Sequence, residues 1–352
     1  MAEQNIPKKP VQPPVSPQNA GEENIPEARR AYSKACLFMF LFGAGWILLI
    51  NAVWLMLGKV FSVKSISESV QYAIIYGIQI GINLPLTLWL AHKFGSAFKP
   101  AEHKMNAGKI ILAFFCCETL GVAGNIVGTF FNAFLTRLLG FDTTFTALQE
   151  SVLGDAGIMF MLCAVLIAPI TEELMFRKVL IDQTRKYGDG SAILLSGLLF
   201  GLMHGNFTQF FYTFALGCFL AFIYVRTGRV RYTITLHVMV NSLGTLVPIF
   251  LKDYLRDLQS WSERLSEAAD RTDVFTMLTL MKQNLPLIIY GICIWAIVIT
   301  GLVLLIVFRK NFHIPPPEKP VPRGKRMTTM CINLGFLLFA LFSAYRFAVL
   351  MA

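Results

Sequence analysis

Long apolar stretches recur along the whole chain and leave few folds open to it. A helix rises 1.5 Å per residue, so about 20 apolar residues cross the roughly 30 Å hydrocarbon core of a bilayer. About nine such stretches are present, at 36–57, 71–91, 108–135, 156–180, 190–206, 207–225, 231–251, 286–308 and 329–351. With 55% hydrophobic and only 15% charged residues, the composition lies outside that of soluble domains. The sequence predicts an all-α, polytopic membrane protein with about nine transmembrane helices.

Lysine and arginine alternate between successive loops, and this alternation predicts the orientation of the helices. Basic residues gather in the N-terminal arm and four further loops, at 92–109, 177–186, 226–231 and 309–326. Because basic loops stay in the cytosol, we expect a multi-pass protein of the cell membrane with a cytosolic N-terminus and an extracytoplasmic C-terminus. The formal net charge of +10 then indicates contact with anionic membrane lipids, and we expect no nucleic-acid partner.

Two segments differ in composition from the rest. The first 30 residues contain six prolines and many polar groups, which predicts a disordered cytosolic tail at 1–30 before one membrane domain at 31–352. An extracytoplasmic loop is predicted at 252–285, where "SWSERLSEAADRTDVF" is typical of a surface amphipathic helix. Within 108–135, Gly124 and Gly128 have the small-xxx-small spacing that predicts close helix packing.

Ionisable residues lie inside the predicted helices, where each costs about 2.5 to 3.5 kcal/mol on insertion scales. They are Glu172 and Glu173 on the fourth helix, His204 on the fifth and His237 on the seventh, with Asn241 one turn further. Counted from the cytosolic ends at 1.5 Å per residue, Glu172 lies roughly 13 Å deep and His204 about 21 Å. His237 lies about 9 Å deep and Asn241 about 15 Å. These overlapping depths predict one polar cavity in the cytosolic half of the membrane.

Residues four positions apart share a helix face. Three polar or aromatic pairs have this spacing: Glu173 with Arg177, Phe200 with His204, and His237 with Asn241. We interpret Glu173 with Arg177 as a structural ion pair. Asn206 lies three residues before Gln209, which is the pattern of a helix N-cap with its capping-box partner. Further polar residues either line the cavity or bond between helices; among them are Gln79, Asn83, Glu118, Asn125 and Arg346.

A carboxylate and two imidazoles can support amide cleavage in two ways. In the first, the carboxylate takes a proton from water while histidine and asparagine side chains donate hydrogen bonds to the developing oxyanion. In the second, two histidines and a glutamate hold Zn²⁺, which acidifies a bound water. The candidate ligands are Glu172, His204 and His237, although the chain lacks the HExxH motif of zinc proteases. Both readings stay open, and we expect activity to survive extensive chelation.

Three motifs occur in order on successive predicted helices. They are "EELMFR" at 172–177, "FGLMH" at 200–204 and "HVMVN" at 237–241. Together they resemble the EExxxR, FxxxH and HxxxN motifs of the CAAX prenyl endopeptidase type II and bacteriocin-processing (Abi, or CPBP) intramembrane proteases. The surrounding sequence "HGNFTQFFYTFALGCFLAFIYVRTG" is similar to the bacterial branch of that family. The resemblance covers about 156–250.

The resemblance implies a role for each motif position. It implies that Glu172 activates the water and that His204 is its partner in holding that water. His237 and Asn241 match the pair on the oxyanion side. The supporting positions are Glu173, Arg177 and Phe200. The family is often labelled as metalloproteases although a glutamate mechanism is favoured for it, so the resemblance leaves metal dependence open.

We therefore expect an intramembrane endopeptidase that hydrolyses a peptide bond of a membrane-associated peptide or protein. The bacterial surroundings favour a peptide or membrane-embedded segment over a prenylated substrate. One alternative is a non-proteolytic membrane regulator or immunity protein that binds a membrane partner, for which Glu172→Ala and His204→Ala would preserve the phenotype. The other is a proton-coupled transporter that uses the same groups as a proton relay, for which substrate-dependent proton flux is expected in liposomes.

Overall fold

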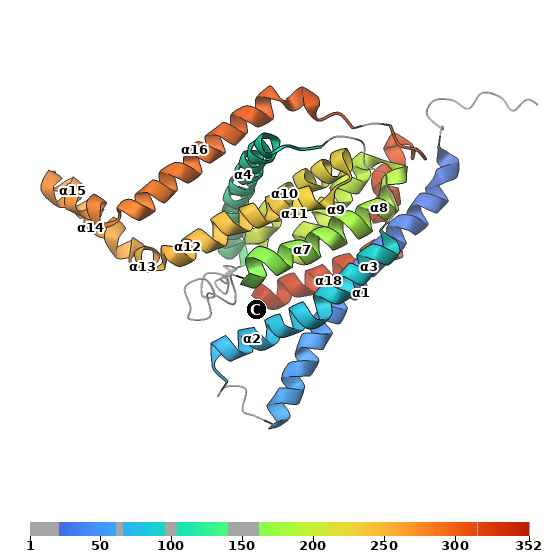
Figure 1. Ribbon diagram of the computed structural model, residues 1–352, viewed down its shortest axis with the longest axis horizontal. Helices are drawn as coiled ribbons and strands as arrows, with labels where there is room; N and C mark the ends of the chain where they lie inside the picture. Colours follow the sequence, from blue (N-terminus) through green and yellow to red (C-terminus); the bar gives the residue numbers. More distant parts are fainter. Residues whose placement is uncertain (1–20, 61–65, 96–103, 140–161, 315, 352) are drawn as a thin grey trace, which may run out of the picture.

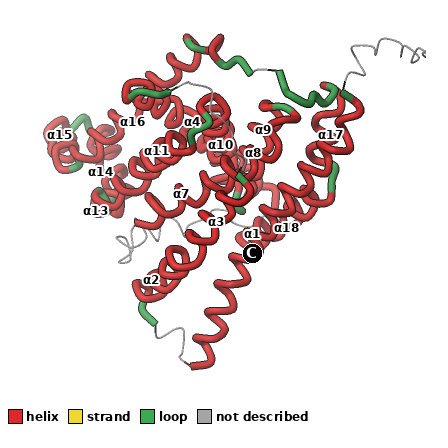
Figure 2. Tube along the Cα trace, turned by 45° about the vertical axis from the view of Figure 1, so that its right-hand side comes forward, coloured by secondary structure: helices red, strands yellow, loops and turns green. Residues whose placement is uncertain are grey.

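The computed structural model describes residues 21–60, 66–95, 104–139, 162–314 and 316–351. These residues form helices and connecting loops, and none of them lies in a strand (Figures 1 and 2). A helix satisfies its backbone hydrogen bonds within its own segment, as a chain must where no water is present. The prediction of an all-α, polytopic membrane protein is confirmed.

Three helical segments contain π-helical turns, one each in the first and third and two in the second. The first is α2 (Glu68–Ile78), η3 (Gln79–Asn83) and α3 (Leu84–Phe94). The second is η4 (Cys163–Ile167), α7 (Ala168–Glu173), η5 (Leu174–Val179) and α8 (Leu180–Thr184). The third is α11 (Val230–Asn241), η7 (Ser242–Leu246) and α12 (Val247–Phe250). Turns of this kind are frequent at functional sites.

The remaining helices complete the bundle. The long ones are α1 (Ile25–Val60), α4 (Ala107–Leu139), α9 (Asp189–Met203), α10 (Phe207–Thr227), α16 (Leu285–Val307) and α18 (Leu334–Met351). The short ones are η1 (Glu22–Asn24), η6 (Arg185–Tyr187), α13 (Lys252–Arg256), α14 (Leu258–Asp270), α15 (Val274–Gln283), η8 (Arg309–Asn311), η9 (Arg323–Lys325) and α17 (Arg326–Cys331). In Figure 1, α7, α9, α10 and α11 form the middle of the bundle, α1, α3 and α18 lie on one side, and α4 and α16 lie on the other.

Within the described ranges, six helices are long and apolar enough to cross a membrane. They become seven if α17 and α18, which meet at an angle of 60°, form one broken span. These helices match the predicted spans except for the fourth, at 156–180, and the fifth, at 190–206. The fifth corresponds to α9, which is shorter than the others. The fourth is helical from Leu162, and residues 156–161 lie outside the described residues. A total of nine spans therefore stays a prediction.

Contacts at one end of the bundle bring several basic segments together. The Glu27 carboxylate at the start of α1 pairs with the amino groups of Lys186 at 3.0 Å and Lys319 at 2.7 Å. The backbone N–H of Lys319 donates to the carbonyl of Lys186, and the Arg226 guanidinium donates to the carbonyl of His313. Four of the segments predicted to be cytosolic thus lie at the same end of the molecule, as the alternation of basic loops requires.

The predicted boundary of the N-terminal tail needs a correction. Residues 1–20 lie outside the described residues, whereas 21–30, which were assigned to the tail, form η1 and the first turns of α1. Ala28 is fully buried, and the Asn24 amide donates to the carbonyl of Pro320. Because these contacts anchor the segment to the loop before α17, the folded domain includes residues from 21 onward.

The predicted amphipathic helix in the loop at 252–285 is present as α14. It ends at Asp270, and a second helix, α15, begins after Asp273, whose carboxylate accepts a hydrogen bond from the backbone N–H of Thr276. The indole N–H of Trp261 donates to the carbonyl of Leu280 and joins the two helices into a hairpin. This hairpin lies at one extremity of the molecule, between α13 and α16 (Figure 1).

The prediction that Gly124 and Gly128 serve helix packing is confirmed. A Cβ atom at Gly124 would overlap the backbone of Tyr212 on α10, and one at Gly128 would lie 2.7 Å from the carbonyl oxygen of Thr208. Backbones can approach this closely only where a side chain is missing. The close approach presses α4 against the first turns of α10.

We expect Gly124→Ala to destabilise the protein by about 1–3 kcal/mol, the usual cost of overpacking. Gly121, on the same helix, is a matched control because a Cβ atom there meets no atom within 4 Å. Gly121→Ala is expected to be neutral or slightly stabilising, since alanine is a better helix former than glycine. Thermal unfolding of both variants in one detergent checks the prediction. Equal losses in the two variants would contradict it.

Candidate active site

The three motif segments meet in the middle of the bundle. Glu172 and Glu173 end α7, directly before the π-helical turn η5, which contains Arg177. His204 is the C-cap of α9, and His237 lies in α11. Glu173, Arg177 and His237 are all buried. The structure thus joins residues that the sequence places on three different helices.

Glu173 is the centre of this cluster. Its carboxylate forms a two-pronged ion pair with Arg177, with Nε to Oε2 at 2.9 Å and Nη2 to Oε1 at 3.1 Å. Its Oε1 also lies 3.0 Å from Nδ1 of His237. Because an ionised carboxylate only accepts hydrogen bonds, Nδ1 of His237 is the donor and Nε2 faces the other way. Glu173 therefore fixes the orientation of the His237 ring.

Arg177 extends the cluster to α9. Its Nη1 donates to the Ser196 hydroxyl at 2.6 Å, and that hydroxyl donates to the carbonyl of Phe176 at 3.0 Å. Its guanidinium carbon lies 5.3 Å from the centre of the Phe200 ring. Bidentate, fully hydrogen-bonded pairs are the form in which buried charges persist. The interpretation of Glu173 with Arg177 as an internal ion pair is confirmed.

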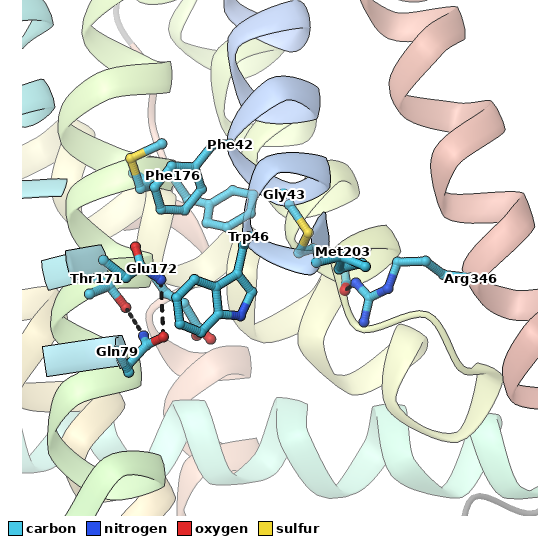
Figure 3. A pocket seen from close by; sticks show the side chains of 12 residues that line it. Phe42, Gly43, Trp46, Gln79, Thr171, Glu172, Phe176, Met203 and Arg346 are labelled. Atoms are coloured by element: carbon cyan, nitrogen blue, oxygen red, sulfur yellow. Dashed lines mark hydrogen bonds between the residues drawn. The ribbon is translucent and has the colours of Figure 1, made fainter. Parts of the chain in front are cut away.

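Glu172 has a different environment from its neighbour. Its side chain is 32% exposed, and its Oε2 lies 3.7 Å from Nε2 of His237. That distance is too long for a direct hydrogen bond, but one water can contact both atoms. Glu172 also lines a cavity of about 220 Å³. Figure 3 shows Thr171, Glu172 and Gln79 beside the Trp46 ring in this cavity.

Phe200 holds both imidazoles. Its backbone carbonyl accepts a hydrogen bond from Nδ1 of His204 at 2.8 Å, which leaves Nε2 of His204 as an acceptor in the neutral ring. Its ring makes edge-to-face contacts with His204 at 4.9 Å and with His237 at 5.7 Å between centroids. No hydrogen bond or ion pair between described residues joins His204 to Glu172. The imidazole that lies nearest to Glu172 in a described contact is that of His237, and the role of His204 in holding the water stays a prediction.

Asn241 lies one turn beyond His237 on α11. Its Nδ2 donates to the carbonyl of Ala164 at 2.8 Å, and the amide keeps a second N–H for another acceptor. Asn241 also lines a second cavity, of about 340 Å³, together with Glu118 and Asn206.

The predicted helix cap at Asn206 is confirmed. The Asn206 side chain accepts a hydrogen bond from the backbone N–H of Gln209 at 2.8 Å and donates one to the Gln209 side chain.

A polar ladder ends at Thr171, next to Glu172, and contains Gln79 and Asn83, which the sequence placed in the cavity or between helices. The Gln79 amide donates to the Thr171 hydroxyl at 3.5 Å, Asn83 donates to Gln79 at 3.0 Å, and Thr87 donates to Asn83 at 3.1 Å. The spacing of 79, 83 and 87 in an apolar stretch was the signal for this ladder. Trp46 offered no such signal. Arg346 donates to the carbonyl of Met203, next to His204, and lines the cavity of Glu172.

The candidate zinc ligands are not grouped closely in this arrangement. Across the described ranges, no three histidine, cysteine, aspartate or glutamate side chains are grouped so that they could hold a metal ion. The bond from Nδ1 of His237 to Glu173 leaves Nε2 of that ring open towards Glu172, and an imidazole held in this way by a carboxylate is common among metal ligands. Metal dependence therefore stays open.

The fold and the site define a polytopic helical membrane protein with a buried carboxylate and imidazole cluster beside an open carboxylate. Residues 154–243 match the family described as Type II CAAX prenyl endopeptidase Rce1-like. This match supports the resemblance of the motifs to that family, and the matched segment, about a quarter of the chain, contains all three motifs.

The chain is also similar to a bacterial protein. The Bacillus subtilis (strain 168) protein named "Putative membrane peptidase YdiL" is 26% identical over 140 residues. The match covers 39% of this chain and 53% of the relative, so the chain spans about half the length of the relative it matches. No solved structure matches the chain.

Proposed function

We propose that the protein is an intramembrane endopeptidase in which Glu172 activates the water that hydrolyses a peptide bond. The observation that supports this most directly is the contrast between two adjacent carboxylates. Glu173 is fully buried and bound to Arg177 and His237, whereas Glu172 is partly exposed to a cavity and, among the described residues, has only the 3.7 Å contact with His237 as an ionic partner. Two carboxylates in unlike environments are typical of sites where one acts as a base and the other positions its neighbours.

The geometry and the resemblance of the motifs together support a role for each remaining group. Glu172 takes a proton from the attacking water and later gives it to the leaving amine. The free Nε2 of His204 accepts the second hydrogen of that water, a role that rests on the resemblance because no described contact joins His204 to Glu172. When the His237 ring is protonated, both of its nitrogens are donors, so Nε2 donates to the oxyanion while Glu173 holds Nδ1. The second N–H of Asn241 is the other oxyanion donor.

The location of the site supports a substrate within the membrane. Trp46, Phe42 and Met203 make the cavity of Glu172 largely apolar, which suits a hydrophobic peptide segment. The basic segments gathered at one end of the bundle support a cytosolic N-terminus and, with an odd number of spans, an extracytoplasmic C-terminus. The site then opens in the cytosolic half of the membrane.

A comparison of peptide termini tests the proposal and identifies the substrate. Membranes that contain the wild-type protein should yield new termini from at least one membrane-associated peptide or protein. Membranes that contain Glu172→Gln at the same abundance should lack them. Identical termini in the two samples would reject the endopeptidase and favour a regulator or transporter.

We expect cleavage to persist after extensive chelation, because the proposed chemistry needs only protein groups and water. The measurement is the cleavage rate before and after chelation, with the metal content of the same samples determined by mass spectrometry. The expected rate changes less than about twofold. Loss of stoichiometric zinc together with activity, and its return when zinc is added, would show that the mechanism depends on metal.

A further inference from the structure

The second cavity contains a carboxyl group that the proposed chemistry does not use. It lies between α4, the first turns of α10 and the end of α11, and has a volume of about 340 Å³. Its polar lining consists of amides and hydroxyls with one carboxylate, and none of the described residues that line it is a lysine, arginine or histidine. The residues that matter here are Glu118, Asn125, Asn206, Gln209, Tyr212 and Asn241.

Glu118 is the buried carboxylate of this cavity. It is only 9% exposed, and its Oε1 has no hydrogen-bond partner among the described residues. It lies eleven residues into α4, roughly 16 Å from the end of the helix at 1.5 Å per residue, and so near the middle of the bilayer. Buried polar atoms are almost always hydrogen-bonded, and membrane carboxylates usually mark a functional site. A hydrogen-bond donor is therefore expected at Oε1 of Glu118, and the described residues do not supply one.

The packing of α4 does not explain Glu118. The adjacent residue, Thr119, donates to the carbonyl of Val298 at 2.8 Å and ties α4 to α16. On the same face, Gly301 of α16 packs directly against the backbone of Phe115. Towards α10, the contact is made by the glycines described above. α10 and α16 are thus both held against α4 without the carboxylate.

The cavity adjoins the reaction site. Asn206 donates to the backbone carbonyl of His204 at 3.3 Å, and Asn241 lies one turn from His237 on α11. Both asparagines line the second cavity. A side chain in this cavity would therefore belong to a substrate residue close to the bond that is cleaved.

We propose that this cavity binds an alkylammonium group of the substrate, from a lysine side chain or a free α-amino group. An ammonium group has three N–H donors, which match the open oxygen of Glu118 and the amide oxygens around it. It also supplies the positive charge that the lining lacks. This inference rests on the proposed endopeptidase function and specifies the substrate as a peptide with an amino group near the cleaved bond.

A peptide panel tests the inference. The probes are twelve-residue apolar peptides that carry either lysine or its uncharged isostere norleucine at one position at a time, each with a free or an acetylated N-terminus. Binding is measured to Glu172→Gln protein in lipid nanodiscs, and cleavage is measured with Glu172 present. Because a hydrogen bond to a charged group contributes about 1.5–3 kcal/mol, lysine at one position should bind roughly 10- to 150-fold more tightly than norleucine.

Two changes in the same background should remove this preference. Glu118→Gln removes the charge at nearly constant size. Gly121→Leu fills the cavity from α4 at a position where a Cβ atom meets no atom within 4 Å, so it keeps the test decisive if Glu118→Gln fails to fold. Glu263→Gln, in the distant helix α14, is the matched control and should keep the preference.

The outcomes separate the inference from the proposed function. A preference that persists on acetylated peptides assigns the group to a lysine side chain, and one confined to free N-termini assigns it to the α-amino group. Equal binding of lysine and norleucine peptides, or a preference that survives both cavity variants, overturns the inference. If the peptides are cleaved but lysine and norleucine peptides bind equally, the endopeptidase function is retained and the ammonium site is rejected. If lysine peptides bind more tightly but no peptide is cleaved, the ammonium site is retained and the endopeptidase function is rejected.

Discussion

Replacement of Glu172 by glutamine is expected to lower the rate of peptide-bond cleavage by about 10²- to 10⁴-fold, the usual contribution of a general base. Glutamine has nearly the same size as glutamate but cannot take a proton from water. Since the side chain is partly exposed to its cavity and pairs only loosely with His237, the fold should tolerate the change. The rate is measured with purified protein on a substrate identified from the new termini.

The matched control is Glu263→Gln, which makes the same chemical change in the α14 helix. Its carboxylate contacts Gln259 on the protein surface, away from the cluster, so the rate should stay within about twofold of wild type. Thermal unfolding of both variants shows whether a lost rate reflects lost structure. A Glu172→Gln protein that folds and still cleaves at the wild-type rate would remove Glu172 from the mechanism.

Local contacts of the site could be predicted from the sequence because helical geometry fixes them. Residues four apart lie on one face, and this rule correctly joined Glu173 to Arg177. The capping pattern correctly identified Asn206 with Gln209 as the start of α10. The glycine spacing on α4 likewise predicted a close helix contact. In each case the partners lie on one helix, or the interface depends on side-chain size alone.

Contacts between distant segments could not be predicted in the same way. Whether Glu172 faces His204 or His237 depends on the rotation of α7 about its axis, and adjacent residues on a helix point about 100° apart. Apolar helices leave this rotation open, because lipid-facing and packed residues have similar side chains. The bond between Glu173 and His237, 64 positions apart, and the place of Trp46 in the cavity became visible only in the structure.

The buried ion pair leads to the second large effect, on stability. Arg177→Met leaves the charge of Glu173 buried without its partner, which typically costs 3–5 kcal/mol. Arg271→Met is the matched control, because Arg271 forms the same type of pair, four residues apart, with Glu267 on the surface. Exposed pairs contribute little, so this variant should unfold at the wild-type temperature. Thermal unfolding in one detergent compares the two.

The double variant Glu173→Leu/Arg177→Met separates the effect of the ion pair on protein stability from its effect on the orientation of the His237 ring. Replacement of a whole buried ion pair by apolar residues of similar volume is often neutral or stabilising, so the double variant should recover most of the stability lost in Arg177→Met. It should not recover cleavage, because the carboxylate that holds Nδ1 of His237 is gone. A double variant as unstable as Arg177→Met would contradict the ion-pair account. A double variant that cleaves at the wild-type rate would show that cleavage does not need the bond between Glu173 and Nδ1 of His237.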